Sequence, residues 1–333
     1  MEYMTTQANE INRREFVKRS LLNTAGGTLA LGTAGTISAG EKAAPLPAVN
    51  SKGDGCPQGK IGKLNISRLI LGSNLITFYV HARDMRFVNN LTKHYNTEGK
   101  ILETLAVAES YGINTIMTQA NENYLKLLRK HRDQNGGKLQ WIVGIAPNAA
   151  KPDEDKETIR KLCESGVEAM YIHGNPCDKI CAAGNKDLIA RTIESIKLND
   201  VPAGAGGHDL NVVKFCEQNK IELDFYVKTF HHHQYPTAPK PDQLKGPYAE
   251  IPGYWCKDPV ETADVMKDVT KPWIAFKVMA AGTIPPESAF KYVYKNGADF
   301  VLAGMFDFEI EEDVKIAREA VAAASTRKRP WRG

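Results

Sequence analysis

The sequence lacks a strong excess of charge of either sign. Its 43 lysine and arginine residues nearly balance 39 aspartate and glutamate residues, which leaves a formal net charge of +4. Proteins that bind nucleic acid generally carry a basic patch or stripe, so we expect no nucleic-acid partner. Long apolar runs are missing too. The stretch 21–37 is rich in Gly, Ala and Thr, and it is too short and too weakly apolar to span a membrane.

Cysteine spacing excludes a further class of protein. None of the six cysteines forms a C-x-x-C pair, so the usual cysteine motif for zinc binding is missing. Cys177 and Cys181 are four residues apart, and two interpretations stay open for them. They could form a disulfide in an oxidising compartment, or they could line a pocket as thiols.

What is present is an ordinary globular composition with a regular pattern. The 333 residues are 42% apolar and 25% charged. Eight strand-like runs alternate with eight helix-like runs, which predicts an α/β fold with a single (β/α)8 TIM barrel. The predicted strands are 68–72, 114–118, 140–145, 168–173, 202–206, 223–229, 273–279 and 300–303. The predicted helices are 97–111, 121–132, 156–165, 186–198, 210–218, 259–268, 287–295 and 310–323.

The N-terminal segment resembles a bacterial twin-arginine export signal. Arg13 and Arg14 are followed by Phe16 and Lys18, and then by the weakly apolar stretch. The resemblance implies a signal peptide over 1–39, a periplasmic location and the twin-arginine export machinery as a partner. The alternative is a basic amphipathic helix. We expect a linker at 40–60, the barrel at 61–324 and a solvated basic tail at 325–333.

The segment 272–310 reads as strand, glycine turn, helix, strand and glycine turn. It resembles the seventh and eighth strands of aldolase-type TIM barrels, in which backbone N–H groups and a helix start hold a phosphate. The resemblance implies that Gly282, Gly304 and Met305 bind a phosphate or carboxylate. Asn74, Trp255 and Tyr226 are further candidates for contact with the substrate, which we expect to be small and derived from a carbohydrate.

Strand alternation predicts which ionisable side chains enter the barrel. If Leu223, Phe225 and Val227 face the helices, Tyr226 and Lys228 point inward. The same reasoning places Lys277 of strand seven inside, and His173 of strand four inside. His208 follows the end of strand five. The predicted catalytic group is therefore Lys228, Lys277, His173 and His208 at one mouth of the barrel.

Two lysines close together would lower each other's pKa, and burial would add to that effect. An amine with a low pKa is a nucleophile toward carbonyls or a general base. This predicts a lyase, aldolase or isomerase that acts on a sugar-like or small carbonyl substrate through Schiff-base or acid-base chemistry. It requires no cofactor. The alternative is that the lysines are structural partners of Asp224 or Asp307.

Three segments resemble the aldo-keto reductases. They are 61–72, 112–116 and Tyr171-Ile172-His173-Gly174, the last of which resembles the strand with that family's catalytic histidine. The family's aspartate, tyrosine and lysine would fall near Met117, near 121–123 and near Ala146, and none of them is matched. The resemblance implies an oxidoreductase whose catalytic tetrad is degenerate.

Two other functions stay open. His173, His208 and His231 could bind a metal in a hydrolase, although glutamate is missing from every strand end. The barrel could also bind a sugar without turnover, through aromatic residues such as Phe78, Tyr79 and Trp255. The chain as a whole resembles a family of exported bacterial TIM-barrel proteins. The segments that carry this resemblance are 205–210, 224–231, 275–282, 305–308 and 311–314. It implies the fold and export, but no reaction.

Overall fold

The computed structural model describes residues 55–82, 85–245 and 256–333. The predicted signal peptide, most of the predicted linker and Trp255 lie outside the described residues. Among the helices of the described part, none combines the length and the apolar character needed to cross a membrane.

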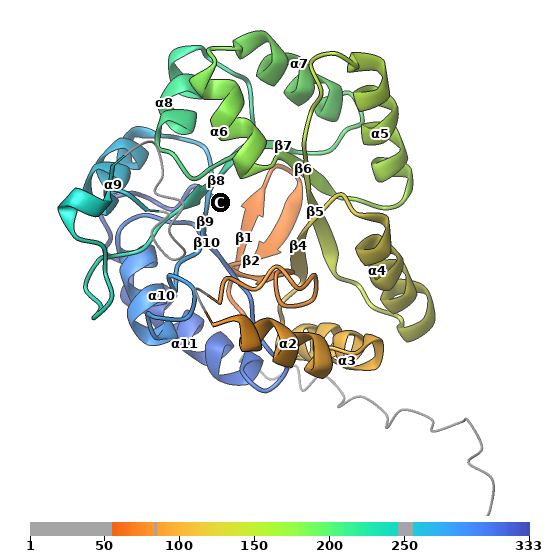
Figure 1. Ribbon diagram of the computed structural model, residues 1–333, viewed down its shortest axis with the longest axis vertical. Coiled ribbons are helices and arrows are strands. Elements are labelled where there is room, and N and C mark those ends of the chain that lie inside the picture. Colours follow the sequence, from red (N-terminus) through yellow and green to blue (C-terminus); the bar gives the residue numbers. More distant parts are fainter. Residues whose placement is uncertain (1–54, 83–84, 246–255) are drawn as a thin grey trace, which may run out of the picture. The chain divides into compact units, whose positions relative to one another are not determined.

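Eight parallel strands form a closed barrel, and helices surround it (Figure 1). The strands follow the chain around the ring, with β10 paired to β3 to close it. Their bounds are β3 Leu69–Gly72, β4 Thr115–Gln119, β5 Gln140–Ile145, β6 Ala169–Ile172, β7 Ala203–Gly207, β8 Phe225–Thr229, β9 Trp273–Phe276 and β10 Phe300–Ala303. The prediction of a single (β/α)8 TIM barrel is confirmed.

Eight helices follow the eight strands, as the sequence predicts. They are α3 Glu98–Ser110, α4 Glu122–Asn135, α5 Pro152–Glu164, α7 Lys186–Lys197, α8 Asn211–Gln218, α9 Pro259–Asp268, α10 Pro286–Lys295 and α11 Ile310–Ala323. Local signals explain several of their ends. The Thr97 side chain caps α3, Asp258 caps α9, and Gly136 ends α4 in a left-handed conformation.

Five elements are additions to the predicted pattern. A hairpin of β1 (Gln58–Ile61) and β2 (Leu64–Ser67) precedes the barrel, so the last residues of the predicted linker are part of a strand. Ile61 and Ile66 of the hairpin are fully buried in the barrel interior, next to the N-terminal ends of the strands. The other three are α2 (Arg86–Tyr95), α6 (Gly174–Ala182) and the short 3₁₀ helix η1 (Pro241–Gln243).

Two groups of buried apolar residues show which side of each strand faces inward. One group contains only residues of the strands and the hairpin, such as Tyr171, Phe225 and Val227, so it fills the barrel. The other joins strand residues such as Met170 and Tyr226 to the helices. The predicted orientation is therefore correct for β6 but reversed for β8. It is reversed for β9 as well, where Ile274 faces inward and Ala275 outward.

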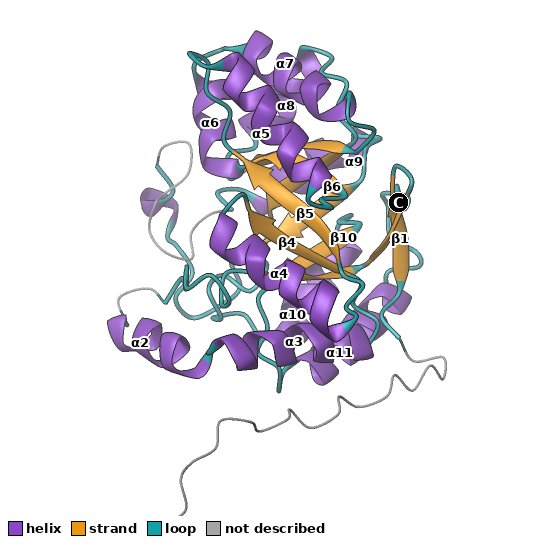
Figure 2. Cartoon of the chain, turned by 90° about the vertical axis from the view of Figure 1, so that its right-hand side faces the viewer, coloured by secondary structure: helices purple, strands orange, loops and turns teal. Residues whose placement is uncertain are grey.

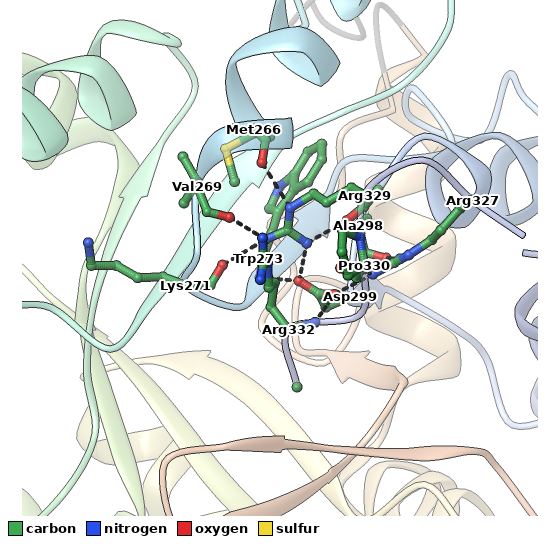
Figure 3. A network of polar contacts seen from close by, with 12 residues as sticks. Met266, Val269, Lys271, Trp273, Ala298, Asp299, Arg327, Arg329, Pro330 and Arg332 are labelled. Carbon is green, nitrogen blue, oxygen red and sulfur yellow. Dashed lines mark hydrogen bonds and ion pairs between the residues drawn. The ribbon is translucent and has the colours of Figure 1, made fainter. Parts of the chain in front are cut away.

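The predicted solvated tail is instead packed against the N-terminal end of the barrel. Asp299, fully buried just before β10, binds Arg327 and Arg329, each at 2.6 Å between a guanidinium nitrogen and a carboxylate oxygen (Figure 3). Its carboxylate also accepts hydrogen bonds from the backbone N–H groups of Trp273 and Arg332. Arg327 and Arg329 are therefore buried rather than solvated, because Asp299, which precedes them by 28 and 30 residues, neutralises both.

Candidate functional site

Lys277 lies at the mouth of the barrel, one residue after β9. Its backbone has a φ of 56°, a left-handed conformation that is rare outside glycine. This conformation breaks the strand alternation at its end. The amine lies 5.8 Å from the centre of the Phe276 ring, which belongs to the inward-facing side of β9. The Lys277 Nζ is 2.7 Å from Nε2 of His81. Residues held in unfavourable backbone conformations often belong to functional sites.

Burial lowers the pKa of the Lys277 amine to about 7. Loss of water around the ring, and then repulsion from neighbouring cationic groups, lowers the pKa of His173 to about 4. The same two causes lower the pKa of His81, with Lys277 as its main neighbour. Near neutral pH the imidazoles are therefore uncharged, while the amine is present in both protonation states.

His208 is held by Asp178, a residue that the sequence analysis did not identify. His208 Nδ1 is 2.8 Å from an Asp178 oxygen, and the backbone N–H groups of His208 and Asp209 donate to the same carboxylate. Because a carboxylate accepts hydrogen bonds, Nδ1 carries the proton that His208 donates to Asp178. Asp178 lies on α6, which was not predicted as a helix, so no sequence signal linked it to His208.

His173 and Tyr171 bring the end of β6 to the same mouth. Tyr171 is buried inside the barrel, and its ring centre is 6.3 Å from that of His173. His173 directly precedes α6, and its charged form would be repelled by both His208 and Lys277. The His208 ring in turn contacts Phe276 at 5.3 Å between centres. The structure thus brings three of the four predicted catalytic residues together and adds His81 to them.

Lys228 is the predicted catalytic residue that lies elsewhere. It shares the outer face of β8 with Tyr226, and its amine donates to the carbonyl oxygen and the hydroxyl of Thr229 at 2.8 and 2.7 Å. It lines a pocket of about 410 Å³ at the N-terminal ends of α8 and α9, together with His208, Asn211 and Thr262. Full burial lowers its pKa. The prediction that Lys228 points into the barrel beside Lys277 is wrong.

Two of the predicted binding residues, Tyr226 and Met305, belong to the apolar layer between the strands and the helices. Tyr226 points away from the mouth, and its hydroxyl donates to Glu217 on α8. Met305 is buried in the outer apolar layer. Gly282 has a φ of 78°, with open space where a side chain would be. Gly304 faces Leu75 at ordinary van der Waals distance, and half-buried Asn74 lies in the turn after β3.

The three consecutive histidines are structural anchors for the loop after β8. His231 Nδ1 contacts the Lys277 carbonyl oxygen, His232 Nε2 contacts the Ser288 hydroxyl, and His233 Nε2 contacts the Cys256 carbonyl oxygen. Among the described residues, no cluster of side chains is arranged to hold a metal ion. Hence the predicted set of His173, His208 and His231 does not form a metal site.

The remaining predicted partners are also elsewhere. Asp224 binds Lys197 on α7 and the backbone N–H of Ala203, and Asp307 binds Lys100 and Tyr95. Cys177 and Cys181 are buried free thiols and do not form the disulfide left open by the sequence.

Comparisons with known proteins agree with this architecture. No protein-family model matches the chain, and no curated protein does. A structure assigned to the aldo-keto reductases, from Pseudomonas aeruginosa, superposes with a TM-score of 0.55 at 16% identity. The alignment covers 80% of this chain and 94% of that one. The holo form of an aldo-keto reductase from Bacillus halodurans gives a TM-score of 0.52 at 10% identity, over 84% and 100% of the two chains. At these identities the likeness establishes the TIM-barrel fold.

Proposed function

We propose that the chain is an enzyme that transforms the carbonyl group of a small molecule, and that it does so by reduction, as aldo-keto reductases do. The observation that carries the proposal is the Lys277 amine at the barrel mouth, beside the neutral imidazoles of His81 and His173. The fold that the chain shares with aldo-keto reductases supports reduction. The lyase or isomerase reaction is less favoured because Lys228, the expected Schiff-base residue, lies outside the barrel.

Lys277 is the proton donor in this proposal. With a pKa of about 7, much of the amine is protonated near neutral pH, and its proton is only weakly held. The proton would pass from Lys277 Nζ to the carbonyl oxygen as negative charge develops there. His81 Nε2, which accepts from the same amine, would keep it pointed into the mouth.

The two other imidazoles would orient the substrate. His173 is neutral above a pH of about 4, so one of its ring nitrogens can donate a hydrogen bond. Asp178 holds the His208 ring at the mouth by accepting a hydrogen bond from its Nδ1. A substrate with a hydroxyl group next to its carbonyl would bring two polar groups to these imidazoles, as sugars and hydroxyketones do. This is the basis on which we propose a carbohydrate-derived substrate.

A reductase of this kind takes its hydride from a nicotinamide dinucleotide. We place one of its phosphates at the turn after β9, because Gly282 leaves open space there. Gly282 would hold the phosphate, since Pro285 and Pro286 at the start of α10 have no N–H group to donate to it. Gly304 is a less favourable candidate, since Leu75 covers it.

The test is an assay with NADPH and NADH over a panel of small sugars, hydroxyketones and aldehydes. We expect nicotinamide oxidation by the wild type and a loss of about 100-fold or more in kcat for Lys277→Met. Lys291→Met is the matched control, because Lys291 is exposed on α10, and it should keep full activity. Equal activity of the Lys277→Met variant would reject the proposal.

A second candidate function follows from the same amine. A lysine with a pKa of about 7 is also a nucleophile, so Lys277 could form a Schiff base in a lyase or isomerase reaction. Borohydride with substrate, in the absence of nicotinamide, would then attach the substrate to the peptide that contains Lys277. An adduct there without nicotinamide oxidation would favour this candidate over reduction. Binding of a sugar without either reaction would support the non-catalytic barrel.

Export remains a separate proposal. It depends on Arg13 and Arg14, and a variant with lysine at both positions tests it. We expect the wild-type chain in the periplasmic fraction of a bacterium with the twin-arginine machinery, and the double variant in the cytoplasm. The same distribution for both chains would contradict it.

A further inference from the structure

Helix α2 packs on the barrel with its polar side and exposes its apolar side. Thr92 is buried, and Val88 and Asn89 are half-buried. Phe87 and Leu91, four residues apart on the opposite side, are 60% and 59% exposed. Amphipathic surface helices of globular proteins normally bury their apolar side. An outward apolar side therefore indicates an interaction surface.

Aromatic residues from the loop after β10 extend this surface. The Tyr95 ring, the next residue of the same helical row, meets Phe306 and Phe308 edge to face, with centres 5.5 and 6.0 Å apart. Phe306 and Phe308 stack on each other, and Phe308 is 68% exposed. We call Phe87, Leu91, Tyr95, Phe306 and Phe308 the α2 face. Figure 2 shows α2 at the outer edge of the barrel domain.

The charged residues of helix α2 itself are basic. The helix carries Arg86 and Lys93, followed by His94, and it has no acidic residue. The loop after β10 adds two acidic residues: the Asp307 carboxylate is bound by the Tyr95 hydroxyl at 2.6 Å and by the Lys100 amine at 3.2 Å, and the Glu309 carboxylate accepts from the Phe306 N–H. Helix α2 thus combines an outward row of large apolar side chains with basic residues of its own.

We propose that the α2 face binds the surface of an anionic lipid membrane. Helices with basic residues beside Phe and Leu lie in the plane of such a surface, with the apolar side chains among the lipids. A second copy of the chain is disfavoured, because a two-fold contact through this face would bring Arg86 and Lys93 against their own counterparts. A sugar is disfavoured as well, because Leu91 offers it neither a ring nor a hydrogen bond.

The full chain and a Phe87→Ser/Leu91→Ser variant are compared for flotation with vesicles. One set contains phosphatidylglycerol and phosphatidylethanolamine, and the other contains only zwitterionic phosphatidylcholine. We expect the wild type to bind the anionic vesicles, more weakly at high salt, and the variant to bind about tenfold less or worse. A Leu198→Ser/Val260→Ser variant is the control, because these residues are 79% and 67% exposed but lie outside the α2 face.

Each result decides for or against the proposal. The substitutions are at exposed positions, so circular dichroism and thermal unfolding should match the wild type. The proposal is overturned if the wild type does not bind anionic vesicles. It is also overturned if the Phe87→Ser/Leu91→Ser variant binds them as well as the Leu198→Ser/Val260→Ser variant does. A dimer in light scattering that only the Phe87→Ser/Leu91→Ser variant dissociates, without vesicle binding, would assign the α2 face to a second copy instead.

Discussion

Replacing buried Asp299 by asparagine should destabilise the barrel far more than the loss of any single charge on its surface. The substitution keeps the size of the side chain and an oxygen that can accept from the Trp273 N–H. It removes the negative charge that Arg327 and Arg329 share at 2.6 Å. All three side chains are almost completely buried. The variant therefore leaves two buried guanidinium groups without a neutralising partner.

The structure gives the size of the effect. Breaking a buried ion pair by removing one partner costs about 3–5 kcal/mol. Part of the Arg329 guanidinium remains satisfied, because it also donates to the carbonyl oxygens of Met266, Gly297 and Val269. We therefore expect a loss near the lower end, about 3 kcal/mol, which corresponds to a drop in Tm of roughly 5 °C for a domain of this size.

Urea unfolding followed by circular dichroism measures the difference in the free energy of unfolding. Asp200→Asn is the control, because Asp200 pairs with Lys63 at the surface and is 92% exposed. Such a surface pair should contribute less than about 1 kcal/mol. Arg327→Met should fall between the two, since Asp299 would keep Arg329. If Asp299→Asn unfolds at the same urea concentration as Asp200→Asn, the C-terminal segment does not clasp the barrel as described.

Three further predictions concern the mouth. If Lys277 donates the proton, kcat/KM for carbonyl reduction falls as the pH rises through about 7, because the amine must be protonated. A pH-rate profile that instead rises through 7 would assign Lys277 the role of base or nucleophile. Asp178→Asn should lower kcat about tenfold or more with little change in KM, because His208 loses the partner that fixes its tautomer. Nitrogen NMR of the His208 ring should show the altered tautomer, and an unaltered spectrum would contradict this role of Asp178. Gly282→Ala should cost about 1–2 kcal/mol of stability through its left-handed φ alone, since no atom obstructs the added methyl group; urea unfolding measures it, and an unchanged midpoint would contradict the backbone conformation.

The sequence was sufficient for the strands and helices of the barrel but not for the direction of every side chain. Strands of a closed barrel are buried on both faces, so apolar residues occupy inner and outer positions alike. In β6 the alternation was read correctly, and Tyr171 and His173 reach the mouth. In β8 the assumption that polar residues face inward reversed Tyr226 and Lys228. A barrel interior is filled by apolar side chains such as Phe225 and Val227.

Lys277 was predicted at the mouth, and it lies there for a different reason. Its place depends on a left-handed backbone conformation that nothing in the sequence around it signals, since such conformations normally require glycine. Contacts between distant segments were equally hidden. Asp178 meets His208 across 30 residues, and His81 meets Lys277 across 196. Phe87, Leu91 and Tyr95 of α2 are spaced four residues apart, which is a helix signal that the pattern of one helix after each strand left out.

The measurement that tests the central claim most directly is the titration of the Lys277 amine itself. Competitive acetylation at a series of pH values, read by mass spectrometry, gives the pKa of Lys277. We predict a midpoint of about 7. A midpoint near 10, about the ordinary value for a lysine, would contradict the proposed role of this amine in carbonyl chemistry.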